Sequence, residues 1–306
     1  MSGRGGGGSG GRRLVIGHLF ADLLNLYGDR GNVATLVRRA RWRGIQVEVR
    51  PIGAADGARL ADVDIAFIGG GQDAEQVAVA AGLETLGSSL VAAVRDGCAL
   101  LAVCGGYQNL GHRYRSELVG ELRGPGLLDL ATEAPAGAPR RVGGVVVELP
   151  DGSPIAEAGR RSAIAAGRAG AERRLVGFEN HSGLTYLGLE ARPIGRTVVG
   201  WGNNGVDGGE GLLAEPGEGG VAGLRVGTYL HGPLLPRNPH LADHVLACGL
   251  ARTGQDAELA VLPDEAEWAA AAAFERRWWE EWISSRARDR SRWGRFRERV
   301  ESLVGF

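Results

Sequence analysis

The chain has 306 residues, of which 44% are hydrophobic, so it is long and apolar enough to bury a substantial core in one large domain or two modest ones. A formal net charge of −1 gives no electrostatic reason to expect nucleic acid as a partner, and no apolar run is as long as a membrane span. The chain contains no lysine, which excludes a standard Walker A phosphate loop and Schiff-base catalysis.

Taken in chain order, the first half of the sequence alternates between strands and helices. Residues 1–13 are rich in glycine and lack the apolar core of a signal peptide, so we expect a disordered tail. Beyond them, strands are predicted at 14–20, 45–52, 63–68 and 98–103, and helices at 33–43, 74–96 and 106–114, the first capped by Asn32 and the second broken near Gly82 and Gly87. This alternation predicts an α/β fold with a mainly parallel sheet flanked by helices.

The second half of the sequence reads mainly as strands until its last fifty or so residues. Strands are expected at 127–131, 142–149, 175–179, 197–200 and 224–230, loops at 151–172 and 203–222, and a helix at 239–249.

A Trp- and Arg-rich extension, residues 251–306, predicts two amphipathic helices. Their aromatic or apolar faces consist of Phe274, Trp278 and Trp282 in the first and of Trp293, Phe296, Val300 and Leu303 in the second. We expect these faces to dock on the preceding domain. A partner-protein surface is the next alternative, and interleaved glutamates disfavour a membrane surface.

Three cysteines, Cys98, Cys104 and Cys248, are an odd number with no C-x-x-C pair. We therefore expect neither a disulfide framework nor a metal site, and we expect a reducing, cytoplasmic setting. Cys98 lies in an apolar run and Cys248 on an apolar helix face, so both are predicted core residues. Cys104 differs because it stands at the exit of the run ALLAV, before two glycines and a predicted helix.

That position of Cys104 is typical of a nucleophile elbow, in which a sharp strand-to-helix turn projects the nucleophile above the sheet. A thiol nucleophile needs a base. His231 follows the strand LRVGTYL, at the rim where α/β proteins form their sites, so it is the expected base, and His181 in GFENHSG is the second candidate. The other four histidines are expected to be packed or on the surface.

Three consecutive glycines, from Gly69 to Gly71, also follow a predicted strand. Such a run leaves backbone N–H groups open to a developing oxyanion, although a tight turn would use the same residues. Its spacing does not match the G-x-G-x-x-G nucleotide fingerprint.

Four segments, GGGQDAEQ, VCGGYQNLG, GFENHSG and TYLHGP, together resemble the class I, triad-type glutamine amidotransferases of the cobyric acid synthase kind. The opening segment LNLYGDRGNVATLVRRARWRG is similar to the glutaminase subunits of lipid II isoglutaminyl synthase, which narrows the resemblance. It covers residues 14–250, which we expect to form one amidotransferase domain with a flavodoxin-like fold.

The resemblance implies that glutamine is hydrolysed to glutamate and that ammonia passes to a Mur-ligase-like partner, MurT, which uses ATP and magnesium to amidate the D-glutamate of lipid II. It implies no cofactor in this chain. Cys104 is the implied nucleophile, and His231 is the implied base and then acid. The implied oxyanion hole uses N–H groups of Gly70 or Gly71 and of Gly105, and the implied substrate contacts are Gln108, Asn180, His181 and Arg140, with Arg141 as the alternative to Arg140.

Pro233 departs from the wider class, because most triad glutaminases have there the glutamate of an H-x-E motif that orients the histidine. We therefore hypothesise that the partner subunit supplies a carboxylate. The missing lysine and the short stretch before residue 14 also lead us to expect the ATP-using half on another polypeptide.

The alternatives are a glutaminase for another acceptor such as a cobalamin-type precursor, another elbow-cysteine enzyme such as a cysteine peptidase or a DJ-1-like protein, and a binding module with a degenerate site. Gln108 and GFENHSG argue against the second, and intact Cys104 and His231 argue against the third.

Overall fold

The structure, a computed structural model, describes residues 11–24 and 28–304, and the side chains of these residues except those of 73 and 286–304. Most of the predicted disordered tail lies outside the described residues, and the first strand already begins at Arg13.

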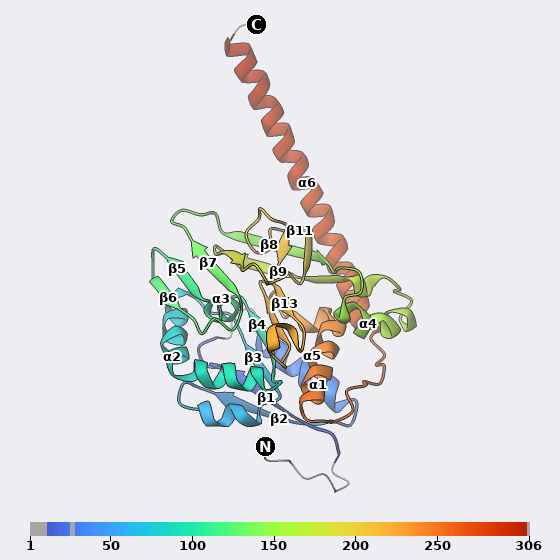
Figure 1. The fold of residues 1–306 in the computed structure, drawn as a ribbon. Helices are drawn as coiled ribbons and strands as arrows, with labels where there is room; N and C mark the ends of the chain where they lie inside the picture. The colour runs from blue at the N-terminus through green and yellow to red at the C-terminus, as the bar shows by residue number, and fades with distance from the viewer. Residues whose placement is uncertain (1–10, 25–27, 305–306) are drawn as a thin grey trace.

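A central sheet is built from β1 (Arg13–Leu19), β2 (Gln46–Ile52), β3 (Ile65–Ile68), β4 (Ala99–Val103), β13 (Leu212–Ala214) and β14 (Arg225–Thr228) (Figure 1). Its order is β13-β14-β4-β3-β1-β2. The parallel part, β2-β1-β3-β4-β14, has the order of a flavodoxin-like sheet, and β13 pairs antiparallel with β14 at the edge. The predicted fold class is confirmed.

Helices cover both faces of this sheet (Figure 1). α1 (Arg30–Arg41) and α5 (Pro239–Arg252) pack against each other on one face, and α2 (Asp73–Arg95) lies on the other, beside the short α3 (Gly105–Asn109). The sequence has no unbroken apolar run as long as a membrane span, but the segment Ala74–Arg95, which includes polar residues, is long and on average apolar enough to cross a membrane by length and composition alone. In the structure its leucines, including Leu86 and Leu90, are buried in the main core, as in the core helix of a globular protein.

Two smaller sheets adjoin the central one. One has the order β10-β7-β5-β6 and the other β12-β11-β8-β9. Their strands are β5 (Arg113–Ser116), β6 (Gly120–Arg123), β7 (Leu130–Ala134), β8 (Arg141–Glu148), β9 (Arg174–His181), β10 (Leu184–Leu187), β11 (Gly195–Val199) and β12 (Gly209–Glu210). A bridge between Phe178 of β9 and His231 joins the second sheet to the segment after β14.

The last helix, α6 (Glu265–Val304), is continuous, whereas the sequence predicted two helices. Its first part lies on the β8–β9–β11 sheet, and the remainder extends away from the body (Figure 1). Phe274, Trp278 and Trp282 pack against buried valines of that sheet, which confirms the predicted docking of the first face. The second predicted face, within 293–303, lies outside the described side chains.

Other predicted boundaries were wrong for physical reasons. α2 runs unbroken through Gly82 and Gly87, where the sequence predicted a break. Both glycines serve packing instead: a Cβ on Gly82 would stand 2.6 Å from the Phe20 ring, and a Cβ on Gly87 would stand 3.2 Å from Pro125. α1 begins before Asn32, whose side-chain oxygen instead accepts the N–H of Leu235.

Two segments with weak sequence patterns also differ from their predicted structure. The predicted loop 151–172 contains α4 (Pro154–Ala165), which starts with a proline in its first turn and continues through alanines that favour helix. The predicted helix 106–114 ends at Asn109, and Tyr114 lies on β5. Short three-ten turns complete the chain at Gly57–Asp62, Ala171–Arg173, Glu218–Gly220 and Leu235–Arg237.

Candidate active site

The candidate site lies where four adjacent parallel strands end. In the order β14-β4-β3-β1, His231 follows the first strand, Cys104 the second and Gly69–Gly71 the third. The segment after β1 leads to Asp29 at the start of α1. Because the carboxyl ends of parallel strands meet at one edge of the sheet, residues far apart in sequence come together there.

Cys104 occupies the strained turn that the sequence predicted between β4 and α3. Its φ of 49° and ψ of −106° lie outside the regions that L-residues favour. The turn is fixed on both sides, since its N–H donates to the Thr228 carbonyl at 2.8 Å and its carbonyl accepts the Gln108 N–H at 2.9 Å. The N–H of Gly106 donates to the Gly69 carbonyl at 3.0 Å, which ties the elbow to the glycine turn.

Gly70 lies between the predicted nucleophile and base. A Cβ on Gly70 would stand 3.2 Å from the Cβ of Cys104, 3.0 Å from Cε1 of His231 and 3.7 Å from Oδ2 of Asp29. The structure therefore brings these three side chains around one point, although they come from three different strand ends.

Burial determines the charge of the cysteine and the histidine. It raises the pKa of Cys104 to about 12, with a further rise from the nearby Asp29 carboxyl. It lowers the pKa of His231 to about 3, and the neighbouring His181 and Arg140 lower it further. At neutral pH the resting site thus holds a neutral thiol and a neutral imidazole that is able to accept a proton.

A pocket of about 580 Å³ opens in front of Cys104. Six of its lining residues were predicted as site residues: Gly71, Cys104, Gln108, Arg140, Asn180 and His181. The remaining lining residues are Gln72, Ala74, Glu75, Gln76, Tyr114 and Ser182. The other predicted residues do not line the pocket, and His231 is fully buried behind it.

The two arginines that the sequence left as alternatives occupy different places. Arg140 lines the pocket, and its guanidinium donates to the side-chain oxygen of Asn180. Arg141 instead donates to the Asn204 carbonyl at 3.0 Å. The structure therefore places Arg140, and not Arg141, where it can meet a ligand in the pocket.

Residues 15–239 match the family model described as the CobB/CobQ-like glutamine amidotransferase domain. The chain belongs to this family. It is a glutamine amidotransferase, as the four sequence segments predicted.

Curated relatives match this amidotransferase over most of its length. The lipid II isoglutaminyl synthase subunit GatD of Staphylococcus aureus is 36% identical over 83% of this chain and 91% of that protein. The subunit of the same name from Streptococcus pneumoniae is 32% identical over 82% of this chain and 86% of that protein. Cobyric acid synthase of Nocardia farcinica is 33% identical over 58% of this chain but over 30% of that protein.

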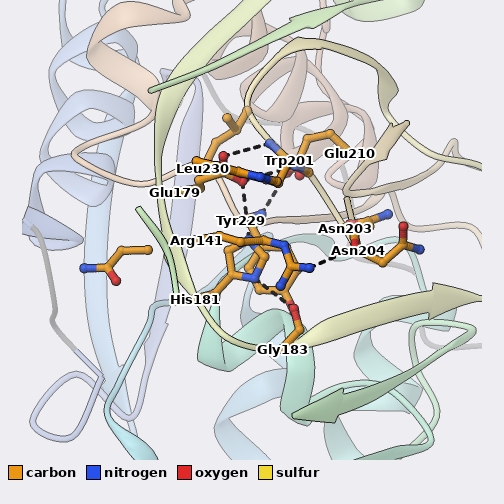
Figure 2. A network of polar contacts seen from close by, with 12 residues as sticks. Arg141, Glu179, His181, Gly183, Trp201, Asn203, Asn204, Glu210, Tyr229 and Leu230 are labelled. Carbon is orange, nitrogen blue, oxygen red and sulfur yellow. Dashed lines mark hydrogen bonds and ion pairs between the residues drawn. The ribbon is translucent and has the colours of Figure 1, made fainter. Parts of the chain in front are cut away.

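A buried polar network lies behind the pocket of the amidotransferase (Figure 2). The His181 ring stacks on Tyr229 at 3.7 Å, its Nδ1 is 2.9 Å from the Gly183 carbonyl and its Nε2 is 3.4 Å from Glu179. The side-chain amide of Gln108 donates to the Tyr229 hydroxyl at 2.9 Å. Two predicted ligand residues are thus held in place by one tyrosine.

The residues that support the site were not predicted from the sequence. Glu179 and Tyr229 lie within the segments GFENHSG and TYLHGP, so their place in those segments was the available signal. Asp29 lies in the opening segment that narrowed the resemblance, where no role was assigned to it. Glu210 accepts the Tyr229 N–H at 2.8 Å but lies in a stretch read as loop, where no pattern marked it.

Proposed function

We propose that this amidotransferase is the glutaminase subunit of a two-chain enzyme that amidates the D-glutamate of lipid II. The partner would be a Mur-ligase-like subunit, MurT, that binds ATP and magnesium. Because the reaction would consume ATP, we propose that it takes place in the cytoplasm. The relatives named GatD support this acceptor, because they match over 91% and 86% of their length, against 30% for the cobyric acid synthase.

One observation carries the glutaminase step: Cys104 and His231 meet at Gly70, behind a polar pocket. The neutral imidazole takes the thiol proton as Sγ attacks the side-chain amide carbon of glutamine. The imidazolium then gives that proton to the leaving nitrogen, which departs as ammonia and leaves a γ-glutamyl thioester. Water, activated by His231, hydrolyses the thioester to glutamate and restores the thiol.

The oxyanion formed in these steps needs N–H donors close to Cys104. The N–H of Gly70 already donates to Asp29 at 2.7 Å, so Gly71 and Gly105 are the proposed donors. The Gly71 nitrogen lies 3.1 Å from the position that a Cβ on Gly105 would take, which supports a common site for the two groups.

The pocket offers separate partners for the two charged groups of glutamine. The α-carboxylate would pair with Arg140, whose guanidinium is suited to a carboxylate. The α-ammonium would meet side-chain oxygens of Gln108, Gln76 and Glu75, which are buried and have no protein partner among the described residues.

Labelling with a glutamine-mimicking diazoketone, with and without a co-expressed Mur-ligase-like partner, tests the glutaminase step. We expect peptide mass spectrometry to find one adduct, at Cys104, which Cys104→Ala abolishes. Cys248→Ala is the matched control, because Cys248 lies on α5 away from the pocket, and it should label like wild type. No adduct in either arm would contradict the proposal.

A second assay tests the acceptor. The complex is supplied with glutamine, ATP, magnesium and lipid II, and the stem peptide is analysed for a carboxamide on D-glutamate. Glutamine hydrolysis without amidation of lipid II would show that the acceptor is different, and a cobalamin-type precursor would then be tested in the same assay.

A further inference from the structure

Asp29 is a fully buried carboxyl group that takes no part in the glutaminase steps proposed above. It follows β1, the strand next to β3 in the sheet, and it precedes α1 without capping that helix through its side chain. Its Oδ2 accepts the Gly70 N–H at 2.7 Å. Its Oδ1 is also buried and has no hydrogen-bond partner among the described residues.

Burial of such a carboxyl is unfavourable unless it is well compensated. The surrounding chain nevertheless makes room for it. A Cβ on Gly69 would stand 2.6 Å from Oδ2 of Asp29. Pro233, two residues after His231, lies 3.0 Å from the position that a Cβ on Gly31 would take, and Gly31 is two residues after Asp29. The loop that carries Asp29 is therefore fitted closely against the segment that carries His231.

We propose that Asp29 is the acidic positioning residue of this active site. Through Gly70 it holds the glycine turn in place, so that the Gly71 N–H stays beside Gly105. Its charge, close to the point where Cys104 and His231 meet, favours the imidazolium that forms when His231 takes the thiol proton. Asp29 would thus do within this chain what the glutamate of H-x-E does elsewhere.

Other charged groups also face the same point. Asp29 raises the pKa of Cys104, and Arg140, beside β8, lowers it. Arg140 and His181 of β9 both lower the pKa of His231. Glu210 of β12 adds negative charge near Cys104. Asp29 is the carboxyl that also touches the glycine turn, so its removal changes both the charge and the geometry of the site.

The inference rests on the roles proposed for Cys104 and His231, and it differs from the hypothesis that the partner supplies the acid. If Asp29 is the positioning residue, its loss affects glutamine hydrolysis in the isolated chain and in the complex alike. If the partner supplies the acid, the complex tolerates the loss.

The test uses the full chain, alone and with its co-expressed partner, and compares two variants. Asp29→Asn keeps the size of the side chain and an oxygen that can accept the Gly70 N–H, but it removes the charge. Asp29→Ala removes both. Asp56→Asn is the matched control, because Asp56 also accepts a glycine N–H, that of Gly53 at 2.8 Å, but lies outside the pocket.

For Asp29→Asn we expect kcat for glutamine hydrolysis to fall by at least about tenfold, with little change in KM. In wild type the acid limb of the pH profile should lie near pH 7, where the buried Asp29 carboxyl ionises, and Asp29→Asn should lack this limb because it has no carboxyl to titrate. With a merely structural role, the variant would keep the limb. Asp29→Ala should lose more activity than Asp29→Asn, and Asp56→Asn should match wild type.

Wild-type kcat with an unchanged acid limb in Asp29→Asn would overturn this inference while leaving the proposed function intact. Full activity of Asp29→Asn in the complex alone would overturn it too and would point to the partner's acid. A wild-type chain that neither hydrolyses glutamine nor labels at Cys104 would overturn the proposed function, and this inference with it.

Discussion

Position 70 requires glycine because of the side chains around it. A Cβ there would stand 3.0 Å from the His231 ring and 3.2 Å from Cys104, so both would have to shift by a few tenths of an ångström. Displacements on that scale disturb proton transfer more than they disturb folding. We expect Gly70→Ala to lower kcat for glutamine hydrolysis by roughly tenfold while the melting temperature stays close to that of wild type.

Gly53→Ala is the control for this substitution, since a Cβ at Gly53 makes an ordinary contact of 3.6 Å with Asp56. Equal kcat in Gly70→Ala and Gly53→Ala would show that the site accommodates a methyl group between its two reacting side chains.

Arg140 and Arg141 offer a second comparison at the level of single residues. Arg140 lines the pocket, whereas Arg141 is bonded to the Asn204 carbonyl. Loss of a charged hydrogen bond to the substrate carboxylate should weaken binding, so we expect Arg140→Gln to raise KM for glutamine by about tenfold or more. Arg141→Gln should leave KM for glutamine unchanged. Steady-state kinetics on the two variants measures both values. A KM that rises in Arg141→Gln but not in Arg140→Gln would contradict this assignment.

Residues that mark the end of a strand could be predicted, whereas those that act through side-chain contacts could not. Cys104 and His231 each follow an apolar run, and the topology rule then places both at one edge of the sheet. The stacking of His181 on Tyr229, and the hydrogen bond from Gly70 to Asp29, join segments that only the folded chain brings together. Spacing along the sequence contains no signal for such contacts.

Among the elements, α6 is positioned by a close approach to β8. A Cβ on Gly144 would stand 2.1 Å from Cγ of Trp278, whereas a Cβ on the neighbouring Gly143 would make ordinary contacts of 3.5 Å or more. We expect Gly144→Ala to displace Trp278 and to weaken the packing of α6 on β8 by about 1–3 kcal/mol. Gly143→Ala should leave this packing unchanged. Tryptophan fluorescence and the rate of proteolysis within α6 measure the difference.

A red-shifted emission and faster cleavage are expected for Gly144→Ala alone. Emission and cleavage that are the same in both variants would mean that α6 does not depend on this contact. Because α6 packs on the outside of the sheet, the central fold should survive in either case.

Buried apolar strands were easier to predict than exposed polar strands of similar length. β3 and β4 are buried throughout, and their unbroken apolar runs indicated strands. β5 has the sequence RYRS and β6 has GELR, and their side chains are mostly exposed, so neither has a pattern that distinguishes it from a loop. The helix at Pro154–Ala165 was hidden in the same way by its small residues.

At the scale of the whole molecule, buried titratable groups make opposing contributions to stability. Burial raises the pKa of Asp29 and of Glu210 to about 7, so between about pH 4 and pH 7 the folded chain keeps protons that the unfolded chain has released. These two carboxyls therefore make stability fall as pH rises. Burial lowers the pKa of His231 and of His240 to about 3. Below about pH 6.5 their unfolded forms bind protons that the folded forms do not, so they make stability rise with pH.

Replacing one of these carboxyl groups should change how the free energy of unfolding depends on pH. Glu210→Gln keeps an oxygen to accept from Thr228 and Tyr229 but no longer titrates. Relative to wild type, its free energy of unfolding should increase by about 1.4 kcal/mol per pH unit between about pH 5 and pH 6.5. Urea unfolding at those two pH values measures this. Glu48→Gln is the control, because arginine neighbours lower the pKa of Glu48 to about 2, so it titrates below that window. A difference between Glu210→Gln and wild type that does not change with pH would mean that Glu210 is already ionised in the folded chain at pH 5.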